Sequence, residues 1–297
     1  MIVSTSGPSF FLSAAKYGCF RLVTSRLETS ISSRSCSILQ QRHLQTVYRN
    51  FWSSNTHVES TTSSSEPALA LIFDTETTGL VKYKKSFSDD SQPNLVQLGM
   101  LLVDTLNWQK KLQVSLLIQP HQPPDENESY IHPGAQKVHG IRHEDCCNFG
   151  VPLETALNLF CDACAQADCL VAHNLKFDRS VMQTAMFRSH SQKNTDTDKV
   201  IDFLRDMPQV CTMEAATDVL KLPGKFRSYK WPTLEESFHY FKEKDATMPQ
   251  AHDALGDTEA CMTVLRGLLE HRFVAPIEKK NAMKSESPML SKLIVFE

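Results

Sequence analysis

Short apolar runs in the first half of the folded part predict β-strands. Residues 68–73 form a continuous apolar run, which is typical of a strand buried on both faces, and the run ends at Asp74. Residues 94–104 and 112–119 predict two further strands, joined by a short polar turn around Asn107. Three consecutive strands with a short connection indicate a hairpin or a meander.

Helical spacing of apolar residues begins after these strands. Residues 152–167 predict a helix with Pro152 near its start, and residues 169–172 predict a fourth strand. Asn174 is a candidate cap for the next helix, and two more helices are predicted at 233–241 and 252–271. Three antiparallel strands followed by β-α alternation predict an α/β fold, in which helices flank a mixed sheet.

The composition is that of a globular protein rather than a membrane or disulfide-stapled protein. Hydrophobic residues make up 41% and charged residues 22%, and no apolar run approaches the ~20 residues that span a bilayer. The nine cysteines are scattered through predicted helices and strands. This pattern favours a reducing compartment.

The first 65 residues differ in composition from the rest of the chain. They contain 23 Ser or Thr, six basic residues and two acidic ones, with an apolar opening at residues 10–12. These properties are typical of a mitochondrial or chloroplast presequence, although a disordered, phosphorylatable tail has a similar composition. We therefore expect a transit peptide and linker at 1–65, one domain at 66–273 and a tail at 274–297. Mitochondrial import is favoured, with the chloroplast as the alternative.

The charge of the folded part limits how it can bind nucleic acid. The chain carries a formal charge of −3, of which residues 1–65 contribute +4, so the remainder carries −7. Broad electrostatic binding of phosphates needs clustered Lys and Arg. Contact with nucleic acid is therefore expected to be local or to depend on metal ions.

Acidic residues stand where the predicted elements end. Asp74 and Glu76 are two apart at the tip of the first strand, which places both carboxylates on one side. Asp178 lies in the first turn of the helix after the fourth strand, and His252 and Asp257 lie near the start of the last helix. A carboxylate-rich set of this kind suits Mg²⁺ or Mn²⁺ better than zinc.

Three segments resemble, in order, the exonuclease motifs of the DnaQ-like family, which includes the proofreading subunit of bacterial replicative polymerase. They are 73–80 (FDTETTGL), 171–178 (VAHNLKFD) and 252–257 (HDALGD). Residues 138–141 (VHGI) resemble the family's short His-Gly-Ile signature. The resemblance covers about residues 68–272 and implies a ribonuclease-H-like fold.

The resemblance implies a metal-dependent 3′→5′ exonuclease of the DEDDh subgroup that releases nucleoside 5′-monophosphates. Asp74, Glu76, Asp178 and Asp257 would bind two Mg²⁺ ions, for which Mn²⁺ can substitute, and His252 would be the general base. The expected substrate is a single-stranded or frayed 3′ end of DNA. The residues expected to contact it are Thr77, Gly79, Leu80, His139 and Asn174.

Four alternatives remain open at this stage. The substrate can be RNA, as for the oligoribonuclease and ribonuclease T relatives, or the chain can be a non-catalytic subunit that holds nucleic acid or a polymerase. Cys161 and Cys164 form a Cys-x-x-Cys pair, but their apolar helical setting favours buried thiols over zinc ligands. His173 has a structural role as an equal alternative to lining the cleft.

Several further features of the sequence have more than one interpretation. Basic and aromatic residues at 225–231, and the lysines at 82, 84 and 85, are candidates for contacting phosphates and bases, with a solvated loop as the alternative. The chain can be a monomer or a homodimer, with a polymerase as a partner in the proofreading case. The tail can dock on the domain, pair with a partner or be disordered.

Overall fold

The computed structural model describes six stretches of the chain: residues 67–120, 130–191, 197–225, 228–242, 246–249 and 251–280. The expected presequence, His121 and residues 281–297 of the tail lie outside the described residues. No helix within the described stretches combines the length and apolar character needed to cross a membrane.

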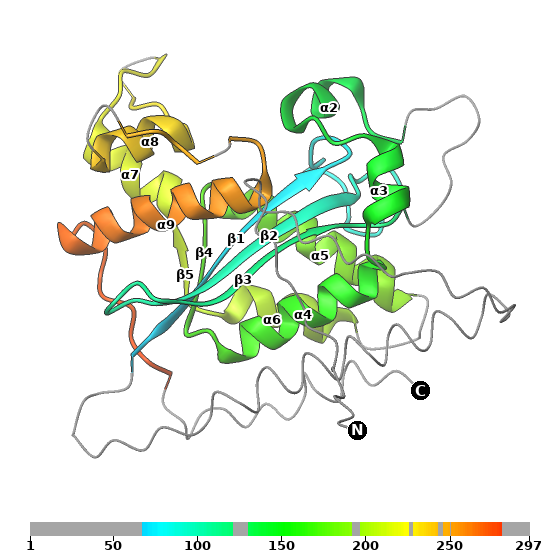
Figure 1. The fold of residues 1–297 in the computed structure, drawn as a ribbon, viewed down its shortest axis with the longest axis horizontal. Helices are drawn as coiled ribbons and strands as arrows, with labels where there is room; N and C mark the ends of the chain where they lie inside the picture. Colours follow the sequence, from blue (N-terminus) through cyan, green and yellow to red (C-terminus); the bar gives the residue numbers. More distant parts are fainter. Residues whose placement is uncertain are drawn as a thin grey trace, which may run out of the picture. The chain divides into compact units, whose positions relative to one another are not determined.

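The core is a five-stranded mixed sheet in the order β3-β2-β1-β4-β5 (Figure 1). β1 pairs antiparallel with β2, and β2 pairs antiparallel with β3, whereas β4 is parallel to β1 and β5 is parallel to β4. The prediction of three antiparallel strands followed by β-α alternation is confirmed, and the arrangement is ribonuclease-H-like. The bounds are β1 Leu69–Thr77, β2 Leu95–Asp104, β3 Lys110–Leu117, β4 Cys169–Ala172 and β5 Gln209–Cys211.

Burial along the strands follows their place in the sheet. Every residue of β2 and β4 is buried, whereas exposed and half-buried residues alternate along much of the edge strand β3. A strand covered on both faces needs apolar residues throughout, and an edge strand does not. The continuous apolar runs of the sequence therefore mark the inner strands.

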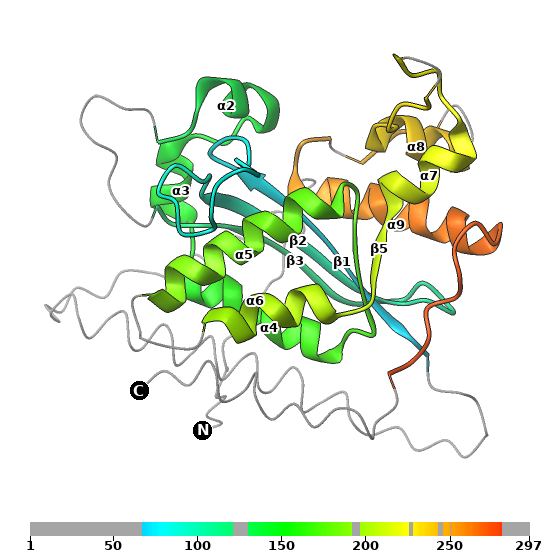
Figure 2. The same ribbon diagram turned by 180° about the vertical axis from the view of Figure 1, so that it is seen from behind.

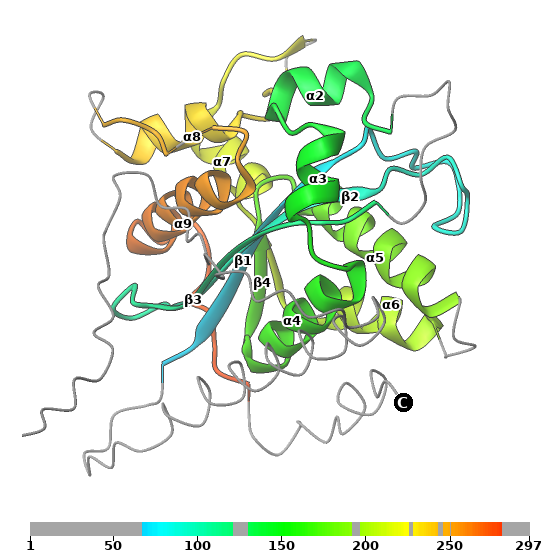
Figure 3. The ribbon, with the colours of Figure 1, turned by 45° about the vertical axis from the view of Figure 1, so that its right-hand side comes forward.

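Helices cover both faces of the sheet (Figure 3). Helix α9 lies on one face, where its Cys261 and Leu265 pack against Ile72 of β1 and Val171 of β4. Helices α4, α5 and α6 lie on the other face, and α5 crosses in front of the strands in Figure 2. The helix bounds are α2 Pro133–His139, α3 His143–Phe149, α4 Leu153–Gln166, α5 Leu175–Ser191, α6 Thr197–Asp206, α7 Thr212–Leu220, α8 Leu234–Phe241 and α9 Ala254–Glu270.

The predicted helices are confirmed, with small shifts at their ends. The last helix begins at Ala254 rather than at residue 252, because the Asp253 side chain accepts a hydrogen bond from Gly256 N and caps it. Asn174 does precede α5, but it adopts φ 73° and its carbonyl accepts from Phe177 N. Helices α2, α3, α6 and α7 and strand β5 were not predicted.

The described part of the tail docks on the domain. Val274 packs against the cluster formed by α8 and α9, and Ile277 packs against the core on the α9 face. Lys280 donates from its backbone N to Asp168 Oδ1 (2.7 Å) and from Nζ to the Ala167 carbonyl (2.6 Å). Of the three possibilities for the tail, residues 274–280 therefore follow the first.

Gly99 allows α9 to approach β2 closely. A Cβ at this position would lie 2.3 Å from the backbone C and O atoms of Ala254 and 2.7 Å from Leu255 N. These backbone atoms cannot move without displacing the start of α9. We expect Gly99→Ala to lower the free energy of unfolding by about 3 kcal/mol, measured by urea denaturation.

The matched control for this prediction is Gly79→Ala. A Cβ at Gly79 would meet only His132 Cβ at 4.0 Å, an ordinary contact, so its stability should remain within about 0.5 kcal/mol of the parent. Equal stability of the two variants would contradict the close packing of α9 on β2.

Candidate active site

Strand β1 presents Asp74 and Glu76 to the face of the sheet that α9 covers. Side chains alternate along a strand, and Ile72, on the same side as Asp74, packs against α9. Phe73, on the opposite side, contacts Phe160 of α4, with 5.1 Å between ring centroids. The alternation predicted from the two-residue spacing thus directs both carboxylates toward α9.

Asp178 reaches the same strand from α5 on the other side. It is 2% exposed, and its Oδ1 accepts hydrogen bonds from Thr75 N (3.0 Å) and Thr75 Oγ1 (2.8 Å). Thr75 lies between Asp74 and Glu76 in β1. This contact was not predicted from the sequence, because it depends on how α5 packs against β1.

His252 and Asp257 are brought to the sheet by the start of α9. Gln97 of β2 donates from Nε2 to Asp253 Oδ1 (2.7 Å), and its Oε1 accepts from Ala254 N (3.1 Å). Gln97 was not predicted either, although a single buried glutamine within an apolar strand is a signal that a polar partner faces it. His252 itself is exposed and has φ 61°.

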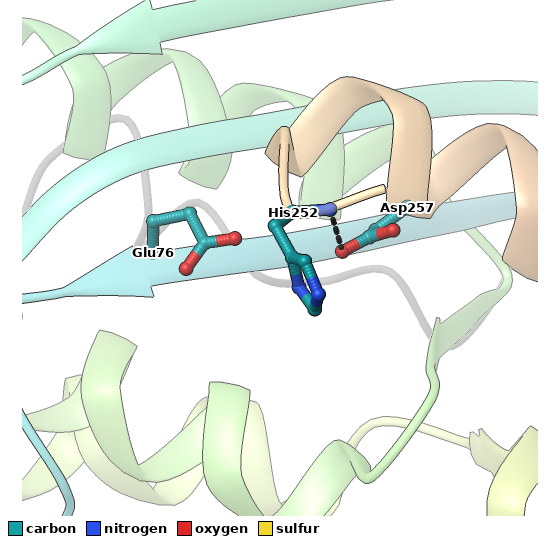
Figure 4. Close-up of side chains that lie close together, drawn as sticks. All are labelled: Glu76, His252 and Asp257. Atoms are coloured by element: carbon teal, nitrogen blue, oxygen red, sulfur yellow. Dashed lines mark hydrogen bonds between the residues drawn. The ribbon is translucent and has the colours of Figure 1, made fainter. Parts of the chain in front are cut away.

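Three of the predicted residues form a group that could hold a metal ion (Figure 4). One ligand atom from each of Glu76, His252 and Asp257 lies within 4.8 Å of the other two. The backbone N of His252 also donates to Asp257 Oδ2 at 3.3 Å. Within the described stretches, this is the one group of three or more Asp, Glu, His or Cys residues that meets this spacing.

The four carboxyl groups of the candidate site all have raised pKa values. Burial is the largest cause for each of them, and repulsion from neighbouring carboxylates adds to it. The pKa is raised to about 8 for Glu76 and to about 7 for Asp178, where hydrogen bonds from Thr75 oppose the rise. The pKa values of Asp74 and Asp257 are also raised. A cation at this place would relieve the repulsion, which is the property expected of a metal site.

These raised pKa values predict how stability depends on pH in the presence of a chelator. A carboxyl group with a raised pKa in the folded state binds more protons there than in the unfolded chain. Its stabilising contribution is complete below the unfolded pKa and is lost as the pH rises to the folded one, a window from 4.5 to about 8 for Glu76. A tenfold difference in proton affinity between the two states corresponds to about 1.4 kcal/mol.

Urea denaturation in EDTA between pH 5.5 and 8 tests this prediction against Glu76→Gln, which cannot ionise. The variant should become more stable relative to the parent as the pH rises. A difference between the two proteins that does not change with pH would contradict the prediction.

The residues expected to bind substrate come from three places: Thr77, Gly79 and Leu80 lie at and just after the end of β1, His139 ends α2, and Asn174 lies between β4 and α5. Not all of them are free to bind a ligand. Thr77 Oγ1 donates to the Gly79 carbonyl (2.6 Å), and His139 Nε2 lies 3.3 Å from the Thr77 carbonyl oxygen. His139 Nδ1 accepts from Ile141 N (3.0 Å), so both ring nitrogens contact backbone. Leu80 is 83% exposed. The structure therefore groups Thr77, Gly79 and His139 and leaves the Leu80 side chain open to a ligand.

Other histidines and cysteines have structural surroundings. Cys161 and Cys164 are buried in α4, and burial raises the pKa of the Cys161 thiol to about 12 and that of Cys164 well above its usual value, which disfavours zinc binding. His173 Nδ1 contacts Thr212 Oγ1 at 3.0 Å, and its Nε2 lies 3.1 Å from the Pro232 carbonyl oxygen. A structural role for His173 explains the contacts that both of its ring nitrogens make.

Comparisons with known proteins identify the family and the fold of the chain. The model of the RNase T family, described as exonuclease, matches residues 71–265. Exonuclease I of E. coli in complex with a dT13 oligonucleotide has a similar fold, with a TM-score of 0.51 and 15% identity over 68% of this chain and 41% of that one. Exonuclease I from Methylocaldum szegediense gives 0.50 and 17% over 69% and 41%. The chain thus spans about two fifths of the length of these proteins. No curated protein sequence matches it.

Proposed function

The chain belongs to the RNase T exonuclease family, and we propose that it is a metal-dependent 3′→5′ exonuclease that favours DNA. The family acts on phosphodiester bonds of nucleic acid. The observation that carries the proposal is the meeting of Glu76, His252 and Asp257, from two segments far apart in sequence, with ligand atoms within 4.8 Å of one another.

The residues present suit two divalent cations, Mg²⁺ or Mn²⁺. Asp74, Glu76, Asp178 and Asp257 offer hard oxygen ligands, and the repulsion that raises their pKa values favours a bound cation. When bound, the ions would supply positive charge beside the phosphate that the anionic nucleophile attacks. Thr75 holds Asp178 in place, and Gln97 and Asp253 fix the start of α9, so the chain preorganises the carboxylates.

His252 is assigned the role of general base. Its imidazole is exposed to solvent, and its backbone N donates a hydrogen bond to Asp257 Oδ2. The side chain can therefore take a proton from a water molecule beside the carboxylates while the backbone keeps its place. Cleavage then leaves a nucleoside 5′-monophosphate and a chain shortened by one nucleotide.

The substrate enters at the end of β1. Leu80 is exposed there and can contact the terminal nucleotide. The family resemblance places the adjoining Thr77–Gly79 segment beside the same nucleotide, and the hydrogen bond from Thr77 Oγ1 to the Gly79 carbonyl orders this segment. Two of the similar solved structures of E. coli Exonuclease I contain the oligodeoxynucleotides dT13 and dA16. Binding of DNA is reported for those proteins, and it supports DNA as the first substrate to test here.

The test is digestion of matched 3′-labelled and 5′-labelled single-stranded DNA and RNA by the full chain. Stepwise shortening from the 3′ end that requires Mg²⁺ and stops in EDTA is expected. Oligonucleotides that differ only in a 2′-hydroxyl on the last nucleotide decide between the DNA and RNA readings. A folded protein that binds DNA but cleaves neither polymer would overturn the proposal in favour of a binding subunit.

We infer that residues 1–65 direct the chain to an organelle, the mitochondrion first and the chloroplast second. The proposal rests on the 23 Ser or Thr and the excess of basic over acidic residues in this stretch. Fusion of residues 1–65 to a fluorescent protein should give organellar fluorescence. A diffuse signal would contradict it.

A further inference from the structure

The connection between β1 and β2 is held in one shape by a buried glutamine. Gln92 is 3% exposed, and its Nε2 donates to the carbonyls of Lys82 (3.1 Å), Lys85 (3.3 Å) and Ser86 (3.1 Å). Its Oε1 accepts from Lys82 N at 3.0 Å. One side chain thus satisfies several backbone groups of the connection, which orders the backbone on both sides of Tyr83.

A second polar side chain, that of Arg188, links the same connection to α5 by hydrogen bonds. Arg188 of α5 donates to the carbonyls of Asp89 (3.4 Å), Asp90 (3.3 Å), Gln92 (2.8 Å) and Pro93 (3.1 Å). It also donates a hydrogen bond to Asn94 Oδ1. Because α5 carries Asp178 in its first turn, the connection has a defined place relative to the candidate active site.

Tyr83 is the aromatic residue of this connection that contacts the start of α5. Its side chain is 53% exposed, and burial of the remainder together with the charge of Asp178 raises the pKa of its hydroxyl. Lys176, two residues before Asp178, places its Nζ 4.6 Å from the centroid of the Tyr83 ring. An exposed ring and an ammonium group therefore lie together at the start of α5, the helix that carries Asp178 in its first turn.

The contribution of the Tyr83–Lys176 pair to the stability of the fold is small. A cation over an exposed aromatic ring contributes about 0.5–1 kcal/mol, and a ring that stays half exposed buries little apolar area. The buried side chain of Gln92 and the half-buried side chain of Arg188 nevertheless hold the connection that carries Tyr83. An aromatic face combined with a cation is the combination that binds a nucleobase and its phosphate in single strands.

We propose that Tyr83 and Lys176 form a subsite for one unpaired nucleotide of the substrate strand. The base stacks on the Tyr83 ring, and the Lys176 ammonium group contacts the phosphate attached to that nucleotide. The subsite selects single-stranded or frayed ends, because a base within a duplex already has both faces covered. This proposal rests on the proposed exonuclease function and specifies how the substrate strand is held.

Substrates with and without a base test the stacking directly. The full chain and its Tyr83→Ala variant are assayed on single-stranded DNA that carries an abasic nucleotide, in turn, at each of the last four positions from the 3′ end. On intact DNA the variant should show kcat/KM about tenfold lower, mainly through KM, as expected for one base–aromatic stack. At one of these positions, removal of the base should lower the kcat/KM of the parent to that of the variant. The kcat/KM of the variant should be the same with and without the base.

A structural role for Tyr83 gives a different result. The variant would then lose the same factor on every substrate, with or without a base, and this outcome would overturn the proposal. Tyr83→Phe should retain at least about half of the activity, because the ring remains. Tyr240→Ala is the matched control, since Tyr240 on α8 is also 53% exposed and should leave kcat/KM unchanged. A parent protein without any nuclease activity would instead refute the proposed function.

The salt dependence of binding tests the assignment of Lys176. Loss of one phosphate contact in a single strand reduces the slope of log K against log salt concentration by about 0.7. Lys176→Gln should show this reduction in fluorescence anisotropy with a labelled oligothymidylate in Ca²⁺, and Lys111→Gln, on the edge strand β3, should not. An unchanged slope in Lys176→Gln would overturn the phosphate contact.

Discussion

Asp74→Asn is expected to lower nuclease activity at least about a thousandfold while the metal-free protein becomes more stable. Asp74 lies among Glu76, Asp178 and Asp257, whose charges add to burial in raising its pKa. Loss of one carboxylate removes one of the proposed ligands of the divalent ions. Such ions contribute several kcal/mol to phosphodiester cleavage, and about 4 kcal/mol corresponds to a thousandfold change in rate. The same substitution removes repulsion within the cluster.

Two measurements separate these effects. Steady-state digestion of single-stranded DNA in Mg²⁺ gives the loss of activity, and thermal denaturation in EDTA at pH 8 should give a higher Tm than the parent. Addition of Mg²⁺ should raise the Tm of the parent more than that of the variant. Asp218→Asn, an exposed carboxylate on α7, is the control and should change neither quantity. Full metal-dependent activity in Asp74→Asn would exclude the proposed site.

His252→Asn is expected to lower kcat by about 10²–10⁴-fold while metal binding is retained. His252 contacts Asp257 through its backbone N, so loss of the imidazole leaves this hydrogen bond in place. Asparagine is preferable to alanine here, because His252 has φ 61° and asparagine adopts the left-handed region more readily than most residues. The substitution therefore tests the proton acceptor rather than the backbone.

The control for His252 is His271→Asn at the far end of the same helix, where His271 is the C-cap residue that follows Glu270. It should leave kcat unchanged. In His252→Asn the rise of Tm with Mg²⁺ should match that of the parent, because the four carboxylates remain. A variant that lost activity together with the response to Mg²⁺ would show that His252 holds metal, and one with parental kcat would remove it from the mechanism.

The elements that were predicted correctly have strong local signals. The runs that became β1 and β4 are continuous and apolar, and β2 is mostly apolar, with Gln97 as its one polar residue before Asp104. Helix α9 carries a long apolar stripe. These patterns are local, so they can be recognised without knowledge of the residues they pack against. Strand β5 has the three residues Gln209–Cys211, too few to show a period. Helices α2 and α3 have seven residues each, and α2 has no buried residue, so an apolar stripe is missing there.

Helix α6 was predictable and was missed. Val200, Phe203, Leu204 and Met207 recur at helical intervals in and just after Thr197–Asp206. Helix α7 follows β5 directly at Thr212, so no loop signal separates the two elements in the sequence. The missing turn signal explains why α7 was not predicted, whereas Pro208 does mark the end of α6.

The amino-acid sequence by itself determined the chemical types of the site residues, their order and the side of β1 on which Asp74 and Glu76 lie, because strand alternation and motif spacing are local. Only the tertiary structure decided that α9 brings His252 and Asp257 to that side, since the approach depends on Gly99 and on the hydrogen bonds of Gln97 across to Asp253 and Ala254. The contact of Lys176 with Tyr83 is likewise tertiary, because it requires α5 to pack beside the β1–β2 connection, to which Arg188 of α5 is hydrogen-bonded.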